Sequence, residues 1–190
     1  MANIMYRREG DNVYGVLNDF DLSSFLTHMD KSLTSKHRTG TKPFMACDLL
    51  NTQWDKGHLY RHDLESMFYV ILIVSCHNTG PLTRASSLRY EDWFNGVDQF
   101  IGYAKTAFLQ SCSPELPVQT YFKGFALWLH EIRLMLGMGL KSRPLEKVVS
   151  FDWDALQGNV AYAKTMEVMR LFDEEELVTH WDGGDITVLV

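Results

Sequence analysis

The chain has 190 residues, of which 46% are hydrophobic, 13% aromatic and 22% charged. This composition is typical of a globular protein with enough apolar residues for one sizeable core. The formal net charge is −6, whereas nucleic-acid binding favours a basic surface, so no nucleic-acid partner is expected.

The cysteines and the longest apolar stretch indicate a reducing compartment and a protein without a membrane partner. Cys47, Cys76 and Cys112 lie far apart with no paired Cys-x-x-Cys spacing, which argues against a zinc site or a disulfide framework. We therefore expect an intracellular location, cytoplasmic or nuclear. Residues 67–76 form an apolar run of about half the length of a membrane-spanning helix, which predicts a buried core helix. The oligomeric state is left open.

The first 60 residues show little helical periodicity. Residues 1–22 favour a β-hairpin, because an apolar run at 14–17 follows a Gly-Asp-Asn turn, which we place at residues 9–12. Residues 23–60 are rich in Ser, Thr, Lys, Gly and His and predict a long loop. Loops of this length inside a compact domain are usually functional.

Residues 61–190 predict a helical bundle within a single domain that spans residues 1–190. Asp63 is expected to cap a helix that runs to about Cys76. Three further helices follow from apolar residues at spacings of three and four, with the aromatic residues expected in the core. Their markers are Trp93 to Phe108 within 91–111, Phe125 to Leu136, and Tyr162 to Phe172. The acidic run at 174–176 is expected to be a solvated face or a fraying tail.

Two aspartates directly after the hairpin are candidate metal ligands. Asp19 and Asp21 follow the second predicted strand, and carboxylates at the end of a rigid strand are a common way to hold a divalent cation. Asp-x-Asp is a weak motif when taken alone, and an exposed turn is the alternative. The order of the features around it carries more information.

That order resembles the C-terminal lobe of protein kinases, and specifically the fungal-type protein kinase family. The series comprises Asn3, the hairpin, Asp19-Phe20-Asp21, a hydroxyl-rich loop, Arg38-Thr39-Gly40-Thr41 with Phe44-Met45-Ala46, and a helix opening with His62-Asp63-Leu64-Glu65-Ser66. The ordered motifs span residues 3 to about 75. The resemblance implies a mainly α fold, with a short hairpin and an activation-segment-like loop before the helices.

The family's roles are implied at matching positions. Asn3 matches the asparagine that ends the catalytic loop, and Asp19 matches the aspartate of the Asp-Phe-Gly motif, both of which hold magnesium on ATP. Thr41 matches the activation-segment threonine that faces the catalytic aspartate. Asp63 matches the helix-start aspartate that supports the catalytic loop. The implied cofactors are ATP and Mg²⁺, and the implied substrate is a Ser/Thr hydroxyl of a protein.

The sequence departs from the family pattern at two motifs. Asp21 replaces the glycine of Asp-Phe-Gly, whose freedom at positive φ helps that segment change conformation. Cys47-Asp48 replaces the Pro-Glu of Ala-Pro-Glu. Asp48 can still pair with an arginine, and the sequence leaves Arg133 and Arg143 open as partners.

Within residues 1–190 no segment supplies a Gly-rich loop, a β3 lysine, an αC glutamate or a catalytic-loop aspartate. A kinase uses these parts to position ATP and the substrate hydroxyl. We therefore expect residues 1–190 to be a truncated lobe that does not phosphorylate by itself and binds MgATP no more tightly than millimolar. Whether the short start is biological is left open.

Several alternatives accompany this hypothesis. A non-catalytic, pseudokinase-like interaction module would keep the same fold. A nucleotide-sugar transferase using Asp19 and Asp21 is less compatible, because its nucleotide-binding strands would precede the motif. His58 and His62 have an i, i+4 spacing, but capping or solvated roles are favoured over a metal site. Hydroxyl groups in 23–41 could be phosphorylated, although loops are commonly rich in Ser and Thr.

Overall fold

The structure, a computed structural model, describes residues 5–16, 41–111, 113, 115–145, 150–172 and 175–176. Contacts within the chain form two compact units, Met1–Arg38 and Thr39–Val190. Helices dominate the described part of the chain, and its strands form two-stranded antiparallel pairs. The mainly α character predicted from the sequence is confirmed.

The first unit contains the predicted hairpin. Strands β1 (Met5–Glu9) and β2 (Asn12–Val16) pair antiparallel from Met5–Val16 to Glu9–Asn12. Gly10 and Asp11 are left as a two-residue turn, in which Gly10 has a φ of +60° that only glycine adopts without strain. The hairpin and its turn are therefore confirmed. The Asp-Phe-Asp motif lies outside the described residues.

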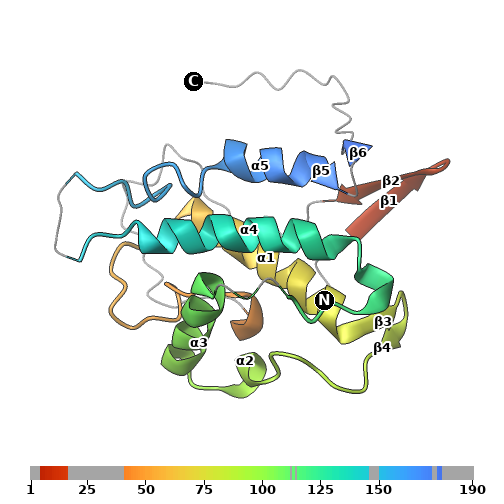
Figure 1. Cartoon of the computed structure of the whole chain (residues 1–190), viewed down its shortest axis with the longest axis horizontal. Helices are drawn as coiled ribbons and strands as arrows, with labels where there is room; N and C mark the ends of the chain where they lie inside the picture. Colours follow the sequence, from red (N-terminus) through yellow and green to blue (C-terminus); the bar gives the residue numbers. More distant parts are fainter. Residues whose placement is uncertain are drawn as a thin grey trace. The chain divides into compact units, whose positions relative to one another are not determined.

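The second unit is arranged around two long helices. In Figure 1, α4 (Phe125–Lys141) runs beside α1 (Tyr60–His77), with α3 (Asp98–Gln110) on one side of α4 and α5 (Tyr162–Arg170) on the other. The remaining elements of this unit are η2 (Lys42–Phe44), β3 (Asn78–Gly80), β4 (Thr83–Arg84), α2 (Asp92–Asn95), η3 (Thr120–Phe122), β5 (Leu171–Phe172) and β6 (Glu175–Glu176).

The core lies between α1, α3 and α4. Phe68 and Leu72 of α1 and Leu129 of α4 are fully buried, and each such side chain contributes about 1.5–3 kcal/mol by leaving water. Helices α3 and α4 come close at Gly137, where a Cβ would overlap the backbone carbonyl of Leu109. The expectation that residues 67–76 form a buried core helix is confirmed.

Helix α1 begins before the predicted cap. Leu59 is the N-cap residue, and its backbone N–H donates to Nδ1 of His62 at 3.0 Å. The prediction that Asp63 caps the helix was wrong, because Asp63 lies inside the first turn, where its charge still favours the helix N-terminus. His62 has the capping role that we favoured over metal binding.

Two other predicted helices differ from the structure. The single helix predicted over 91–111 is divided at Gly96 into α2 and α3, where Gly96 N–H bonds to the carbonyl of Asp92 at 3.0 Å. The last helix ends at Arg170, so Phe172 lies in β5, which pairs with β6 in the acidic run. Asp173 and Glu176 would lie three residues apart on a continued helix, and like charges at this spacing repel, which disfavours the helix there.

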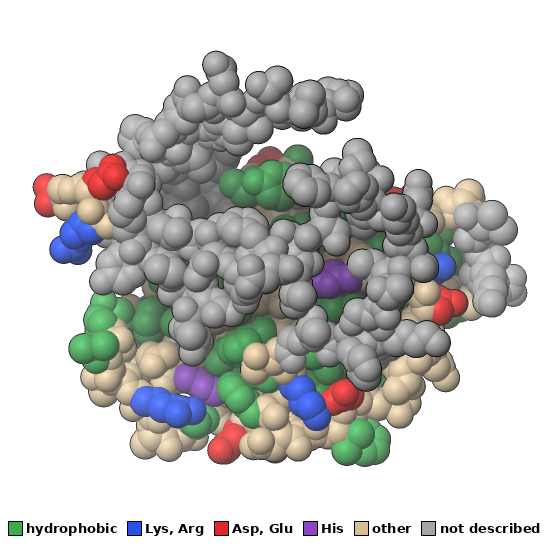
Figure 2. Space-filling model, turned by 180° about the vertical axis from the view of Figure 1, so that it is seen from behind, with side chains coloured by type: hydrophobic (Ala, Val, Ile, Leu, Met, Phe, Trp, Pro, Cys, Tyr) green, Lys and Arg blue, Asp and Glu red, His purple; other side chains and the backbone are tan. Residues whose placement is uncertain are grey.

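The surface of the second unit is not uniformly polar. Figure 2 shows apolar side chains at the surface of the described part, between basic, acidic and histidine side chains. Two aromatic residues expected in the core are exposed, namely Phe100 on α3 (69%) and Tyr162 on α5 (62%). Among the described residues, no helix has the length and apolar character needed to cross a membrane.

Candidate functional site

Residues 41–50, the anchored segment, belong to the predicted activation-segment-like loop. Thr41 has an extended backbone (φ −85°, ψ 118°), and a single 3₁₀ turn with Pro43 follows it. The chain then turns inward, so that Ala46 and Leu50 are completely buried. A loop of this kind needs partners for its buried polar groups, and side chains of α1, α3 and the α4 end provide them.

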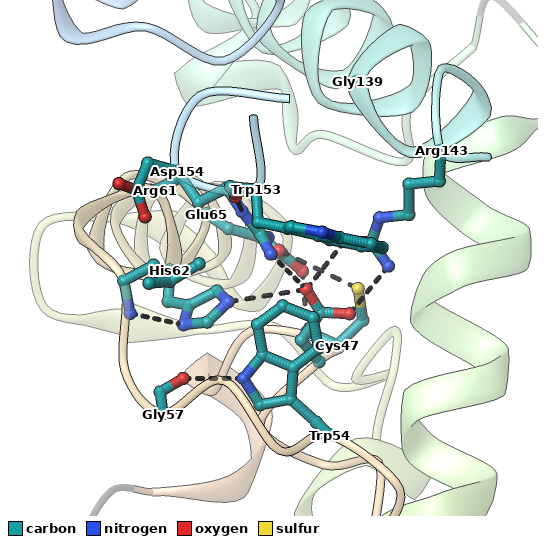
Figure 3. Close-up of polar contacts among 12 residues, drawn as sticks. Cys47, Trp54, Gly57, Arg61, His62, Glu65, Gly139, Arg143, Trp153 and Asp154 are labelled. Carbon is teal, nitrogen blue, oxygen red and sulfur yellow. Dashed lines mark hydrogen bonds and ion pairs between the residues drawn. The ribbon is translucent and has the colours of Figure 1, made fainter. Parts of the chain in front are cut away.

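The carboxylate of Asp48 is the centre of a buried charge cluster. Arg143, just beyond α4, donates to both of its oxygens, at 2.8 Å to Oδ1 and 2.7 Å to Oδ2. Arg61 of α1 donates to Oδ2 at 2.7 Å, and His62 Nε2 lies 3.4 Å from the same oxygen. Figure 3 shows Arg61 and His62, both from α1, and Arg143, from beyond the end of α4, converging on one carboxylate.

This geometry decides between Arg133 and Arg143, the two arginines that the sequence left open as partners of Asp48. Arg143 forms the pair, whereas Arg133 donates to the carbonyl of Ser113 and lies 3.2 Å from Nδ1 of His130. The two-pronged contact matches the planar guanidinium to the carboxylate, which is the strongest form of this interaction.

The surroundings keep Asp48 ionised although it is buried. Burial by itself raises the pKa of this carboxyl, but the His62 ring and the Arg143 and Arg61 guanidinium groups lower it, and the resulting pKa lies well below the usual range. His62 is affected in the opposite sense, since burial is the largest influence on its ring and lowers its pKa. At neutral pH the cluster therefore holds a charged carboxylate and a neutral imidazole.

Glu65, one turn along α1, binds the backbone of the anchored segment. Its Oε1 accepts hydrogen bonds from the backbone N–H of Cys47 and the hydroxyl of Tyr69, both at 2.8 Å. Burial raises the pKa of the Cys47 thiol well above its ordinary value, so the thiol is not a reactive thiolate. Cys47 thus behaves as a packed core residue.

Lys105 of α3 holds the carbonyl side of the same segment. Its Nζ donates to the backbone oxygens of Lys42 (3.1 Å), Pro43 (2.9 Å) and Met45 (2.5 Å). The ammonium also lies 4.0 Å from the centre of the Tyr69 ring. Three acceptors match the three N–H bonds of an ammonium group, while burial lowers the pKa of Lys105 to about 7.

Close packing completes the attachment. Gly102 of α3 lets the helix approach the segment, since a Cβ there would lie 3.2 Å from the carbonyl oxygen of Cys47. The Ser66 hydroxyl donates to the carbonyl of Phe44, and the Phe44 ring meets Phe94 edge to face with centroids 6.5 Å apart. The anchored segment is therefore fixed from both α1 and α3.

The described residues include only part of the predicted site. Thr41 lies at the start of the anchored segment, is exposed, and makes no capping bond with its side chain. Asn3, Asp19 and Asp21 lie outside the described residues, so their roles stay predictions. Asp63 is 71% exposed at its side chain and binds His58 Nε2 at 2.8 Å. No cluster of three or more potential ligands among His, Cys, Asp and Glu occurs in the described ranges.

Sequence reasoning missed Arg61, Glu65 and Lys105, the three buried ionisable residues that anchor the segment from the helices. A signal for Lys105 exists, because it is flanked by Ile101 and Leu109 at i−4 and i+4 on the buried face of α3. Charged residues are rarely buried without a partner, so a lysine on an apolar stripe indicates a fixed acceptor nearby.

Comparison with known proteins relates one part of the chain to a known family. Residues 1–75 match the family model described as fungal protein kinase, so this N-terminal part of the chain is related to that family. The match ends inside α1 and includes the anchored segment with Asp48, Arg61 and Glu65. No curated protein and no solved structure matches the chain.

Proposed function

We propose that this chain forms the protein-substrate side of a protein kinase homologue, with Thr41, the exposed start of the anchored segment, as the place that receives the substrate. The proposal rests on the fixation of residues 41–50 by side chains of α1 and α3. Residues 41–50 lie in the part of the chain that is related to fungal protein kinases. A loop held by buried ion pairs and by three carbonyl bonds keeps one conformation. Positioning of this kind is what phosphoryl transfer requires from the protein.

In this proposal the complete reaction is phosphoryl transfer from MgATP to a Ser/Thr hydroxyl. Thr41 would lie beside the incoming hydroxyl, since it is the exposed residue at the open end of the anchored segment. Asn3 and Asp19 would hold magnesium on the nucleotide phosphates, as the resemblance implies. Asp48, Arg61 and Arg143 act indirectly and are positioning residues.

The experiment is site-specific crosslinking. A photo-crosslinking amino acid replaces Thr41 in the full chain, and the control carries it at Glu131, an exposed position on α4. Short Ser/Thr peptides should crosslink at position 41 and not at position 131. Equal labelling at both positions would overturn the proposal.

Calorimetry with MgATP tests whether the chain contributes only the protein-substrate side of the reaction. We expect no binding by residues 1–190 below millimolar concentration, because the Gly-rich loop and β3 lysine with which kinases position ATP are not among these residues. Micromolar, magnesium-dependent binding that Asp19→Ala abolishes would overturn the restriction to the substrate side.

A second candidate is an interaction module without any phosphoryl transfer. It is favoured by large apolar side chains at the surface, namely Phe100 (69% exposed) and Leu127 (73% exposed). In that case partner binding would persist while Thr41 is not crosslinked to Ser/Thr peptides.

A further inference from the structure

The α2–α3 groove is an open depression of about 800 Å³ outside the anchored segment. It lies where α2 ends, the chain passes Gly96, and α3 begins. Its lining residues are Tyr90, Glu91, Asp92, Trp93, Asn95, Gly96, Val97, Phe100, Ile101 and Ala104.

The groove presents apolar side chains that the described structure leaves in contact with solvent. Val97 is 63% exposed and Phe100 is 69% exposed, while Trp93 and Ile101 are buried beneath them. Val97 is the N-cap residue of α3, and Phe100 and Ala104 are four residues apart on the helix, so the apolar surface extends from the helix start along about one helical turn. Such a strip accommodates a large aliphatic or aromatic side chain.

The charged side chains that line the groove are acidic. Glu91 and Asp92 are exposed lining residues, and no lysine or arginine belongs to the lining. The neighbouring Asp98 differs, because Lys42 neutralises it at 2.8 Å. The carboxylates of Glu91 and Asp92 make no ion pair within the described residues, so they are available to a cation from outside.

The groove adjoins the anchored segment and is tied to it by Lys42. Lys42 donates to the carbonyl of Gly96 at 3.2 Å while pairing with Asp98 at the start of α3. Gly96 cannot be replaced by a larger residue without change, since a Cβ would lie 2.8 Å from the carbonyl oxygen of Asp92 and 3.1 Å from Ile101. A preformed surface of this kind loses little entropy when it binds.

We propose that the α2–α3 groove docks a segment of a partner protein that carries one large apolar side chain flanked by lysine or arginine. The apolar side chain packs against Val97 and Phe100, and the flanking cations pair with Glu91 and Asp92. An anionic ligand is disfavoured by the same two carboxylates. The inference does not depend on phosphoryl transfer.

The test measures fluorescence anisotropy of a short labelled peptide with the full chain. The peptide has a central phenylalanine between arginine pairs in a Gly/Ser background. We expect micromolar binding that weakens with added salt, because exposed charges are screened over about 10 Å at 0.1 M salt. One comparison peptide replaces phenylalanine with serine and another replaces the arginines with glutamate, and both should bind at least about tenfold more weakly.

Matched variants locate the site. Phe100→Ser and Glu91→Lys should each weaken binding of the arginine peptide about tenfold or more. Met138→Ser and Glu131→Lys change another exposed apolar residue and an exposed acid on α4, and they should bind as the parent does. Circular dichroism of all four variants checks that a loss of binding does not come from unfolding.

Three results would overturn the inference. The first is parent-like binding by Phe100→Ser and Glu91→Lys, and the second is equal binding of the glutamate peptide. The third is sedimentation that shows a dimer of the parent and a monomer of Phe100→Ser, because the groove would then bind a second copy of this chain. Loss of the Thr41 crosslink alone would leave the inference standing.

Discussion

Replacement of Asp48 by alanine tests whether the charge cluster holds the anchored segment in place. The change leaves Arg61, whose side chain is 2% exposed, without its carboxylate, whereas Arg143 is 23% exposed and can turn toward water. Removing one partner of a buried ion pair costs about 3–5 kcal/mol, and the solvent access of Arg143 favours the middle of this range. Such a loss is a large part of the ~5–15 kcal/mol that stabilises a typical domain.

The assay is urea unfolding followed by tryptophan fluorescence, which reports directly on this region because Arg61 lies 5.2 Å from the centre of the Trp54 ring. A loss of about 4 kcal/mol corresponds to a fall in Tm of roughly 8–16 °C for a chain of this size. The control is Asp63→Ala, which removes a carboxylate that is 71% exposed and paired with His58, and should cost at most about 1 kcal/mol. If Asp48→Ala costs no more than Asp63→Ala, the cluster does not hold the segment and the reasoning is wrong.

Four other predictions concern the same unit. Because folding lowers the pKa of Asp48, the difference in unfolding free energy between the parent and Asp48→Ala should be constant above about pH 5. The difference should shrink as the pH falls below about 4, where the carboxylate of the unfolded chain becomes protonated. A difference that grows in acid would contradict this. Lys105→Met leaves three buried carbonyls without a donor and should cost about 2–4 kcal/mol in urea unfolding at neutral pH. The pKa of Lys105 is about 7 in the folded chain and about 10.4 in the unfolded chain, so the unfolded chain binds more protons between these pH values. The unfolding free energy of the parent relative to that of Lys105→Met should therefore rise with pH in this range. A fall would refute the assignment. Gly137→Ala should cost about 1–3 kcal/mol by pushing α3 from α4, whereas Gly80→Ala, whose nearest atom would lie 3.9 Å away, should change the unfolding free energy by less than about 0.5 kcal/mol.

Sequence patterns correctly predicted the elements that depend on residues close together in the chain. The Gly-Asp-Asn signal gave the hairpin with its turn, and the apolar run at 67–76 gave the core helix. The same patterns failed where one residue changes the path of the backbone. Gly96 divides α2 from α3 although the apolar spacing continues across it.

The candidate site depended on long-range contacts that a single sequence does not contain. Both Arg133 and Arg143 were acceptable partners for Asp48, since spacing along the chain says nothing about which guanidinium reaches a carboxylate 95 residues away. Glu65 lay in the helix-opening motif quoted from the sequence, yet its bond to the Cys47 backbone N–H follows only from the packing of α1 on the anchored segment. The roles of Asn3 and Asp19 come from the family resemblance and stay predictions.

The carboxylate of Asp48 joins residues 13 and 95 positions away in the sequence. Closing the longer of these two loops costs chain entropy before any contact rewards it, so the Arg143 contact is expected to form late in folding. Interactions that are absent from the folding transition state slow unfolding and have little effect on the folding rate. The ion pair should therefore lengthen the lifetime of the folded anchored segment, which makes resistance to slow proteolysis a sensitive measure of its contribution.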